Sequence, residues 1–301
     1  MVQRDDGRFD AVPGGAPANV AVGLARLGVD CRFLGRFGAD AFGPLSRARL
    51  ADAGVRLDAA VDTDRLSTMA VVALSPQGTP EYSFYLEGTA DWGWTLDELP
   101  PDDPDAIHVG SLAAAVDPAR TVISRHVHRL AAAGTTTVSC DPNVRPKLGF
   151  DHRSETARIV DLAGASHLVK VSDEDLAWLY PGEPVAVVVA RWRRDGVDAQ
   201  IIVTLGAAGS VLYRPNGAVV RVEAKPVTVV DTIGAGDAFC SATLAALSDA
   251  DALGTAPKAR LAALSDGDWA RILAAASRAA ELTCSRPGAD PPSWPEWEAC
   301  R

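Results

Sequence analysis

Short apolar runs alternate with segments of helical periodicity over most of the chain from residue 106 onward. The predicted strands are residues 106–109, 136–140, 167–171 and 200–205, and the predicted helices between them include residues 118–133 and 154–165. Strands that alternate with helices in this way form a parallel sheet with both faces covered. The pattern therefore predicts an α/β fold, in which ligands bind beyond the carboxyl ends of the strands.

The first third of the chain has a different pattern. Helices are predicted at residues 18–27 and 44–53, each followed by a glycine. Three β-rich runs, at residues 55–61, 69–75 and 81–86, then follow without a helix between them. Their alternation of apolar and polar positions suits a sheet with one solvated face. They predict a small β element that is separate from the main sheet.

A glycine-rich turn joins an apolar run to a helix near residue 234. Residues 229–231 are predicted to end a strand and residues 238–247 to form a helix, with Gly234 and Gly236 at the helix start. Glycine lets the backbone turn sharply, and the first N–H groups of a helix attract an anion such as phosphate. Asp237 is well placed there to accept a proton from a hydroxyl group that attacks a phosphoryl group. Alternatively, Asp237 only complements the helix dipole and the glycines only shape a turn.

The C-terminal third is predicted to contain two more short strands, a loop and a helix. The strands are residues 211–214 and 219–223, the irregular polar loop is 249–268, and the helix is 269–282.

Composition narrows the class of protein. The chain has 301 residues, of which 48% are hydrophobic and 23% charged, as in ordinary globular proteins. Its formal net charge of −10 argues against nucleic-acid and anionic-membrane partners, which require a basic face. The five scattered cysteines argue against a disulfide framework and a zinc site. No apolar run approaches the ~20 residues of a membrane span, and residues 1–13 are polar, so a cytoplasmic protein is expected.

Polar side chains gather where the predicted strands end. They lie in residues 108–111, 141–146 and 170–175. Arg145 could bind a phosphate through its planar guanidinium, although an exposed salt bridge explains an arginine equally well. Asn19 carries an amide that can bind sugar hydroxyls; the alternative is a helix cap or a buried structural amide.

Two longer motifs resemble signatures of a known family. Residues 231–237 are D-T-I-G-A-G-D, and residues 14–28 are G-G-A-P-A-N-V-A-V-G-L-A-R-L-G. They resemble the C-terminal and N-terminal signatures of the PfkB (ribokinase-like) family of sugar kinases, the second in its fructokinase form. The resemblance implies a ribokinase-like three-layer α/β/α sandwich with a mostly parallel central sheet and a small β-sheet lid.

The lid is expected to be a discontinuous part of one kinase domain that spans residues 1–301. It would comprise about residues 1–13, 29–38 and 55–92, and it would close over the sugar and exclude water. Relatives often form dimers through this element, so the resemblance also implies a homodimer.

The resemblance further implies a reaction, the transfer of the γ-phosphate of ATP to a hydroxyl of a small sugar, with fructose as the first candidate. Asp237 would be the general base, and the backbone amides of Gly234, Ala235 and Gly236 would form the anion hole. The residues implied in sugar binding are Gly14, Gly15, Asn19, Asn143, Arg145 and Asp237.

Nucleotide and metal sites are implied by matches elsewhere in the chain. The residues implied in ATP binding are Lys170, Ser172, Thr204, Gly206, Gly209, Gly234 and Gly236. A glycine-rich hairpin explains the turn at 204–210 equally well. Asp175 would organise Mg²⁺, which is held mostly by nucleotide oxygens and waters. A monovalent cation such as K⁺ would be held, mainly by backbone carbonyls, at Asp231, Ile233, Thr283, Arg286 and Gly288.

The sequence departs from the family pattern at two places. Leu86 stands where arginine is common, which removes a candidate contact to the substrate. Relatives carry a first strand that ends in an acidic residue, and residues 1–13 do not match it. A kinase for another substrate, such as ribose or 2-keto-3-deoxygluconate, therefore stays open, as does a catalytically weak protein that binds a sugar or nucleotide.

Overall fold

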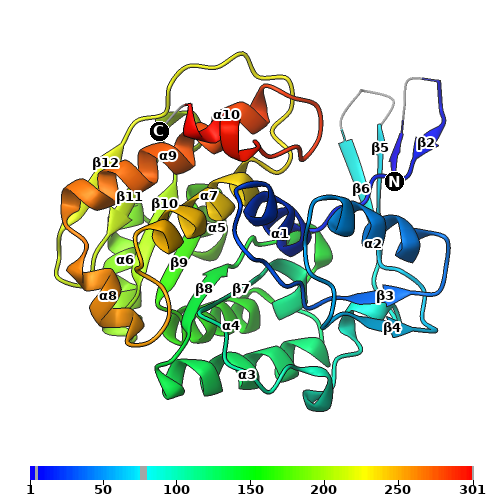
Figure 1. Ribbon diagram of the computed structural model, residues 1–301, viewed down its shortest axis with the longest axis horizontal. Helices are drawn as coiled ribbons and strands as arrows, with labels where there is room; N and C mark the ends of the chain where they lie inside the picture. The colour runs from blue at the N-terminus through cyan, green and yellow to red at the C-terminus, as the bar shows by residue number, and fades with distance from the viewer. Residues whose placement is uncertain (4–5, 75–79, 300–301) are drawn as a thin grey trace.

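The structure, a computed structural model, describes residues 1–3, 6–74 and 80–299 (Figure 1). Its strands are β1 (Val2–Gln3), β2 (Phe9–Asp10), β3 (Arg36–Gly38), β4 (Val61–Thr63), β5 (Met69–Leu74), β6 (Pro80–Tyr85), β7 (Ala106–Gly110), β8 (Thr137–Asp141), β9 (Leu168–Ser172), β10 (Gln200–Thr204), β11 (Ser210–Tyr213) and β12 (Val219–Val222). Its α-helices are α1 (Ala16–Arg26), α2 (Phe42–Asp52), α3 (Ala119–Ala133), α4 (His152–Gly164), α5 (Asp173–Leu179), α6 (Val185–Arg194), α7 (Ala235–Asp249), α8 (Pro257–Ala263), α9 (Asp266–Cys284) and α10 (Trp294–Glu298).

A six-stranded sheet forms the centre of the molecule, in the order β12-β11-β10-β9-β8-β7. The strands β7 to β10 are parallel, whereas β11 and β12 are antiparallel to their neighbours. Helices connect the parallel strands, as the alternating pattern predicted. The predicted α/β fold with a mostly parallel sheet is confirmed.

Neighbouring residues of one strand enter two different hydrophobic cores. Leu168 and Ile202 pack in a core with residues of α1, α7 and α9. Val169 and Ile201 pack in a second core with residues of α3, α4 and α6. Because side chains alternate along a strand, helices on both faces are needed to bury such continuous apolar runs. This arrangement gives the three layers of the sandwich.

Two small sheets lie beside the sandwich, on the side where the N-terminus is found (Figure 1). One has the order β2-β1-β5-β6, and the other pairs β3 with β4. Their strands come from each of the three segments that the family resemblance assigns to a lid. The division of the chain into a kinase domain with a lid stays a prediction.

The prediction of a strand at residues 55–61, the first of the three β-rich runs, is wrong. The strand β4 begins only at Val61. Val55 is instead buried in a cluster with Phe37 and Leu50. Its apolar side chain packs against a helix, and a short apolar run does not reveal which kind of partner it has.

The predicted strand at residues 229–231 is also absent. Val229 and Val230 are each 59% exposed, and the N–H of Val230 donates to the carbonyl oxygen of Cys284. The segment lies against the C-terminal end of α9 and pairs with no strand in the described part of the chain.

The segment 249–268 is not irregular throughout, because it contains α8. This helix begins at Pro257, and its Leu261 is buried. Proline is favoured in the first turn of a helix, where its missing N–H has no intrahelical role, so here it begins a helix rather than interrupting one.

No helix within residues 1–3, 6–74 and 80–299 has both the length and the apolar character that a membrane span requires.

Candidate active site

The N-terminus of α7 approaches its neighbours so closely that it requires glycine. Gly234 has a φ angle of 78°, and a Cβ atom there would lie 2.6 Å from the Cβ of Ala289. A Cβ atom on Gly236 would lie 3.0 Å from Nζ of Lys170. The first turn of α7, whose N–H groups have no partners within the helix, therefore lies next to a buried ammonium group.

Asp237 lies in this first turn and is only 8% exposed. Nδ2 of Asn19 in α1 donates a hydrogen bond of 2.7 Å to its Oδ2. Burial raises the pKa of Asp237 to about 6, and the hydrogen bond from Asn19 lowers it in part. Within the described residues no hydrogen bond reaches Oδ1, which can therefore accept one from a further donor.

A buried ion pair lies beside the helix tip. Nζ of Lys170 in β9 is 3.0 Å from Oδ2 of Asp141 in β8, and the two side chains are 9% and 5% exposed. Burial opposes the charge of Lys170, but its neighbours together outweigh this effect, with Asp141 contributing most, so the pKa of Lys170 is raised. Both charges act on Asp237, whose pKa Asp141 raises and Lys170 lowers.

The loop after β8 carries Asn143 and Arg145. Asn143 has a φ angle of 44°, and its N–H donates to Oδ1 of Asp141 at 3.2 Å. Nη1 of Arg145 donates to the carbonyl oxygen of Val144 at 3.2 Å, and the charge of Arg145 lowers the pKa of Asp237. Arg145 forms no ion pair with a carboxylate of the described residues, so its remaining N–H donors can bind an anion.

Gly14 and Gly15 are exposed and precede α1. Gly15 is the N-cap residue of this helix, with a φ angle of 112°. Asn19 lies inside the helix and is buried, with its backbone N–H bonded to the carbonyl oxygen of Gly15 at 2.9 Å. Asn19 is therefore not a helix cap, which was one of the alternatives for this residue.

Ser172 and Asp175 form a capping box at the start of α5. Ser172 Oγ accepts from the N–H of Asp175 at 3.0 Å, and Asp175 Oδ2 accepts from the N–H of Ser172 at 3.3 Å. Asp175 Oδ1 accepts from the N–H of Val144 at 2.9 Å. Both carboxylate oxygens thus support the fold, and no cluster of three or more His, Cys, Asp and Glu side chains suited to a metal occurs among the described residues.

The glycine turn after β10 brings together two glycines with different roles. Thr204 ends β10, and Gly206 begins the 3-10 turn Gly206–Ala208. A Cβ atom on Gly209 would lie 2.1 Å from the carbonyl oxygen of Val222 in β12, so sheet packing alone requires this glycine. Gly206, in contrast, is exposed and faces open space.

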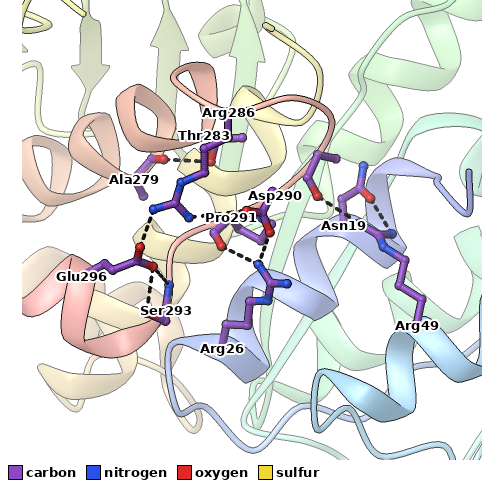
Figure 2. A network of polar contacts seen from close by, with 11 residues as sticks. Asn19, Arg26, Arg49, Ala279, Thr283, Arg286, Asp290, Pro291, Ser293 and Glu296 are labelled. Atoms are coloured by element: carbon purple, nitrogen blue, oxygen red, sulfur yellow. Dashed lines mark hydrogen bonds and ion pairs between the residues drawn. The ribbon is translucent and has the colours of Figure 1, made fainter. Parts of the chain in front are cut away.

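The segments around residues 231 and 288 lie side by side. Oδ2 of Asp231 accepts from the N–H of Gly288 at 2.9 Å, and its Oδ1 accepts from the N–H of Ile233 at 2.9 Å. Thr283 is buried in the last turn of α9, and the side chain of Arg286 points away to Glu296 (Figure 2). The five residues predicted around a monovalent cation are therefore close in space.

A model of the pfkB family of carbohydrate kinases matches residues 2–297 of the chain. The chain belongs to this family. The resemblance seen in the two sequence motifs is thereby confirmed.

Relatives of this pfkB-family chain include fructokinases. A fructokinase of Klebsiella pneumoniae is 37% identical over 249 residues, which cover 81% of this chain and 79% of that protein. The crystal structure of a fructokinase from Xylella fastidiosa with bound ATP superposes with a TM-score of 0.89 at 29% identity and covers 100% of this chain and 94% of that one. The structure of a Vibrio cholerae O395 fructokinase with fructose, ADP and a calcium ion has a TM-score of 0.82 at 27% identity, covering 96% and 90%.

Two residues of this candidate site were not singled out by the sequence analysis. Asp141 was noted only as part of a polar cluster, although Lys170, a charge inside an apolar strand, indicates that an adjacent strand must supply a carboxylate. Arg49 in α2, whose Nη1 donates to Oδ1 of Asn19 at 2.9 Å, has no sequence signal, because its distance from Asn19 depends on how two helices pack.

Proposed function

We propose that this chain is an ATP-dependent sugar kinase that phosphorylates a hydroxyl of a small sugar, with fructose as the first candidate. The observation that carries the proposal is the buried carboxylate of Asp237, which Asn19 holds at the N-terminus of α7. The fructokinase relatives support fructose as the substrate. They also support a nucleotide and a metal ion as partners of the reaction.

Asp237 would act as the general base. Its Oδ1 takes the proton of the sugar hydroxyl while that oxygen bonds to the γ-phosphorus of ATP, and the bond from phosphorus to the bridging oxygen of ADP breaks. A pKa of about 6 keeps the carboxylate ionised at neutral pH while making it more basic than an ordinary aspartate. The amides of Gly234, Ala235 and Gly236, together with Arg145, would stabilise the charge of the phosphoryl group.

The sugar would lie between the N-terminus of α1 and the loop after β8. The nucleotide would lie along the carboxyl ends of β9 and β10. The residues assigned to the sugar are Gly14, Gly15, Asn19, Asn143 and Arg145, and those assigned to ATP are Lys170, Ser172, Thr204, Gly206 and Gly209. Lys170 would act mainly through its charge, because Nζ is already bonded to Asp141.

Fewer protein side chains are proposed as metal ligands here than the sequence suggested. Mg²⁺ would neutralise phosphate charge, held by phosphates and waters, because both oxygens of Asp175 already accept backbone hydrogen bonds. A monovalent cation would be held by backbone carbonyls near Asp231 and Gly288, where the carboxylate supplies negative charge.

The test of the proposal is Asp237→Asn. We expect kcat to fall by roughly 10²–10⁴-fold, the usual contribution of a positioned base, while ADP and sugar binding by calorimetry stay close to those of the wild type. Asp249→Asn, at the other end of α7, is the matched control and should keep full activity. Near-wild-type turnover by Asp237→Asn would rule out the assigned role of Asp237.

A kinase for another substrate is the second candidate, because Leu86 packs against the cluster of Trp92 and Trp94 and supplies no charge to a ligand. Coupled ADP release should be measured with fructose, ribose and 2-keto-3-deoxygluconate. The highest kcat/KM identifies the substrate. Sugar binding without ADP release from any of them would indicate a binding protein instead.

We further propose a homodimer formed through the sheet β2-β1-β5-β6. Phe9 and Tyr85 on this sheet are 42% and 55% exposed and supply apolar surface. Light scattering should give twice the mass of the chain, and Tyr85→Ser should shift it toward the monomer. A monomeric wild type would contradict this proposal.

A further inference from the structure

The guanidinium of Arg49 connects three parts of the chain that are far apart in sequence (Figure 2). Arg49 lies in α2, and its Nη1 donates to Oδ1 of Asn19 at 2.9 Å. Its Nη2 donates to the carbonyl oxygen of Ala289 at 3.1 Å. The two hydrogen bonds are donated by different nitrogen atoms of a rigid planar group, so they fix its position relative to both α1 and the turn at residues 286–291.

The bond from Arg49 determines which way the amide of Asn19 faces. Oδ1 of Asn19 is taken by Arg49, and Nδ2 donates to Oδ2 of Asp237 at 2.7 Å. A rotated amide would place its NH₂ group against the guanidinium and its oxygen against the carboxylate, which gives two repulsive contacts. Arg49 therefore favours the orientation in which Asn19 is a donor to Asp237.

Three other charged side chains, those of Asp141, Lys170 and Arg145, also act on Asp237. Asp141 from β8 and Lys170 from β9 are bonded to each other, and Arg145 donates to a backbone carbonyl. Cys240, one turn further along α7, keeps its proton because burial raises the pKa of its thiol. The donor from Asn19 is the contact that lowers the pKa of Asp237 most, against burial and the charge of Asp141, which raise it.

We infer that Arg49 is a positioning residue for the reaction: it orients the Asn19 amide and thereby holds the carboxylate of Asp237 in its ionised form. This inference rests on the proposed role of Asp237 as the base. Arg49 acts on Asp237 through the Asn19 amide and through the direct attraction between the two charges, and it need not touch the sugar or the nucleotide.

Arg26 provides a matched comparison within the same network (Figure 2). It pairs with Asp290 and donates to the carbonyl oxygen of Pro291 at 2.8 Å, so it ties α1 to the same turn as Arg49 does. Among the described residues, Arg26 forms no hydrogen bond with Asn19 and no ion pair with Asp237. If Arg49 only anchors this turn, replacing Arg26 should therefore have the same effect on the protein as replacing Arg49.

The experiment is the pH profile of kcat/KM for wild type, Arg49→Met and Arg26→Met. Activity falls as pH drops because Asp237 must be ionised, and in Arg49→Met we expect the midpoint of this fall to move upward by about one pH unit. Arg26→Met should keep the wild-type midpoint, even where its melting temperature decreases. Equal shifts in both variants, or no shift in Arg49→Met, would overturn the inference.

Arg49→Lys is the second variant, for use also where Arg49→Met folds poorly. It retains the charge and one donor, so its midpoint should lie between those of wild type and Arg49→Met. A shift as large as in Arg49→Met would overturn the inference. Asp237→Asn separates the two proposals: if it stays active, the proposed function fails, whereas an inactive Asp237→Asn with an unshifted Arg49→Met profile removes only the role of Arg49.

Discussion

An ion pair at the carboxyl edge of the six-stranded sheet and an ion pair at the small sheets differ in their exposure to water. At the edge, Lys170 and Asp141 are 9% and 5% exposed and bond to each other. On the small sheets, Arg47 pairs with Asp62 of β4, and these side chains are 34% and 78% exposed. One pair is shielded from water, and the other remains largely solvated.

This difference affects how firmly each pair holds its two charges in place. Buried charges interact strongly and tolerate little displacement, because each depends on its partner. Surface pairs contribute little and can break and reform. The Lys170–Asp141 pair is therefore suited to holding charge in a fixed position, whereas the Arg47–Asp62 pair constrains its surroundings little.

The largest effect that tests the comparison is expected from Lys170→Met. It leaves Asp141 buried without its cation, and breaking a buried pair in this way destabilises a protein by about 3–5 kcal/mol. Urea unfolding at pH 7 measures the change. Lys258→Met, which removes an exposed pair with Asp198, is the control and should change stability far less.

Equal losses for the two lysine variants would show that the edge of the sheet is not distinct from the surface. The loss in Lys170→Met should also shrink when Asp141 is replaced by Asn in the same chain, because the uncompensated charge is then gone. A double variant as unstable as the single one would point to lost packing of the lysine stem instead.

The six-stranded sheet and the small sheets also differ in how well the sequence predicted their strands. The strands β7 to β10 were found because they are apolar throughout and buried on both faces, which gives a strong local pattern. The small sheets gave weaker patterns, and residues 55–61 were wrong because Val55 packs against α2. Burial that depends on a distant helix leaves no periodic signal.

The candidate site was predictable to the extent that one local motif carries it. The tip of α7 combines glycines and Asp237 within four residues, and its motif was recognised. The pairs Lys170 with Asp141 and Arg49 with Asn19 join residues about 30 positions apart. Such contacts follow from strand order and helix packing, which a single sequence does not specify.

A smaller effect concerns the stability cost of burying Asp237. Its pKa is about 6 in the folded chain and 3.8 in the reference state, so the folded chain binds more protons between these values and loses stability as pH rises through them. Above pH 6 the ionised form costs roughly 3 kcal/mol, since one pKa unit corresponds to about 1.4 kcal/mol. Asp237→Asn removes this cost.

Asp237→Asn should therefore be more stable than wild type by about that amount at pH 7 and equal to it near pH 3.5. Chemical denaturation at a series of pH values measures the difference. A gain that is independent of pH would mean that the carboxylate is not the origin of the effect. The expected pattern would mean that the carboxylate of Asp237 lowers the stability of the fold at neutral pH.

The smallest effect is expected on the small sheets, from Asp62→Asn. The carboxylate is mostly solvated, so its pairing with Arg47 should contribute less than about 1 kcal/mol at low salt and almost nothing in 1 M salt, where charges are screened within a few ångströms. Arg47 keeps its place over the ring of Phe37, with 4.5 Å from the guanidinium carbon to the ring centre, so the variant isolates the ion pair from that contact. Thermal unfolding of the two proteins at both salt concentrations measures the difference. A loss that is larger and insensitive to salt would mean that this exposed pair is held as tightly as the buried pair of Lys170 and Asp141.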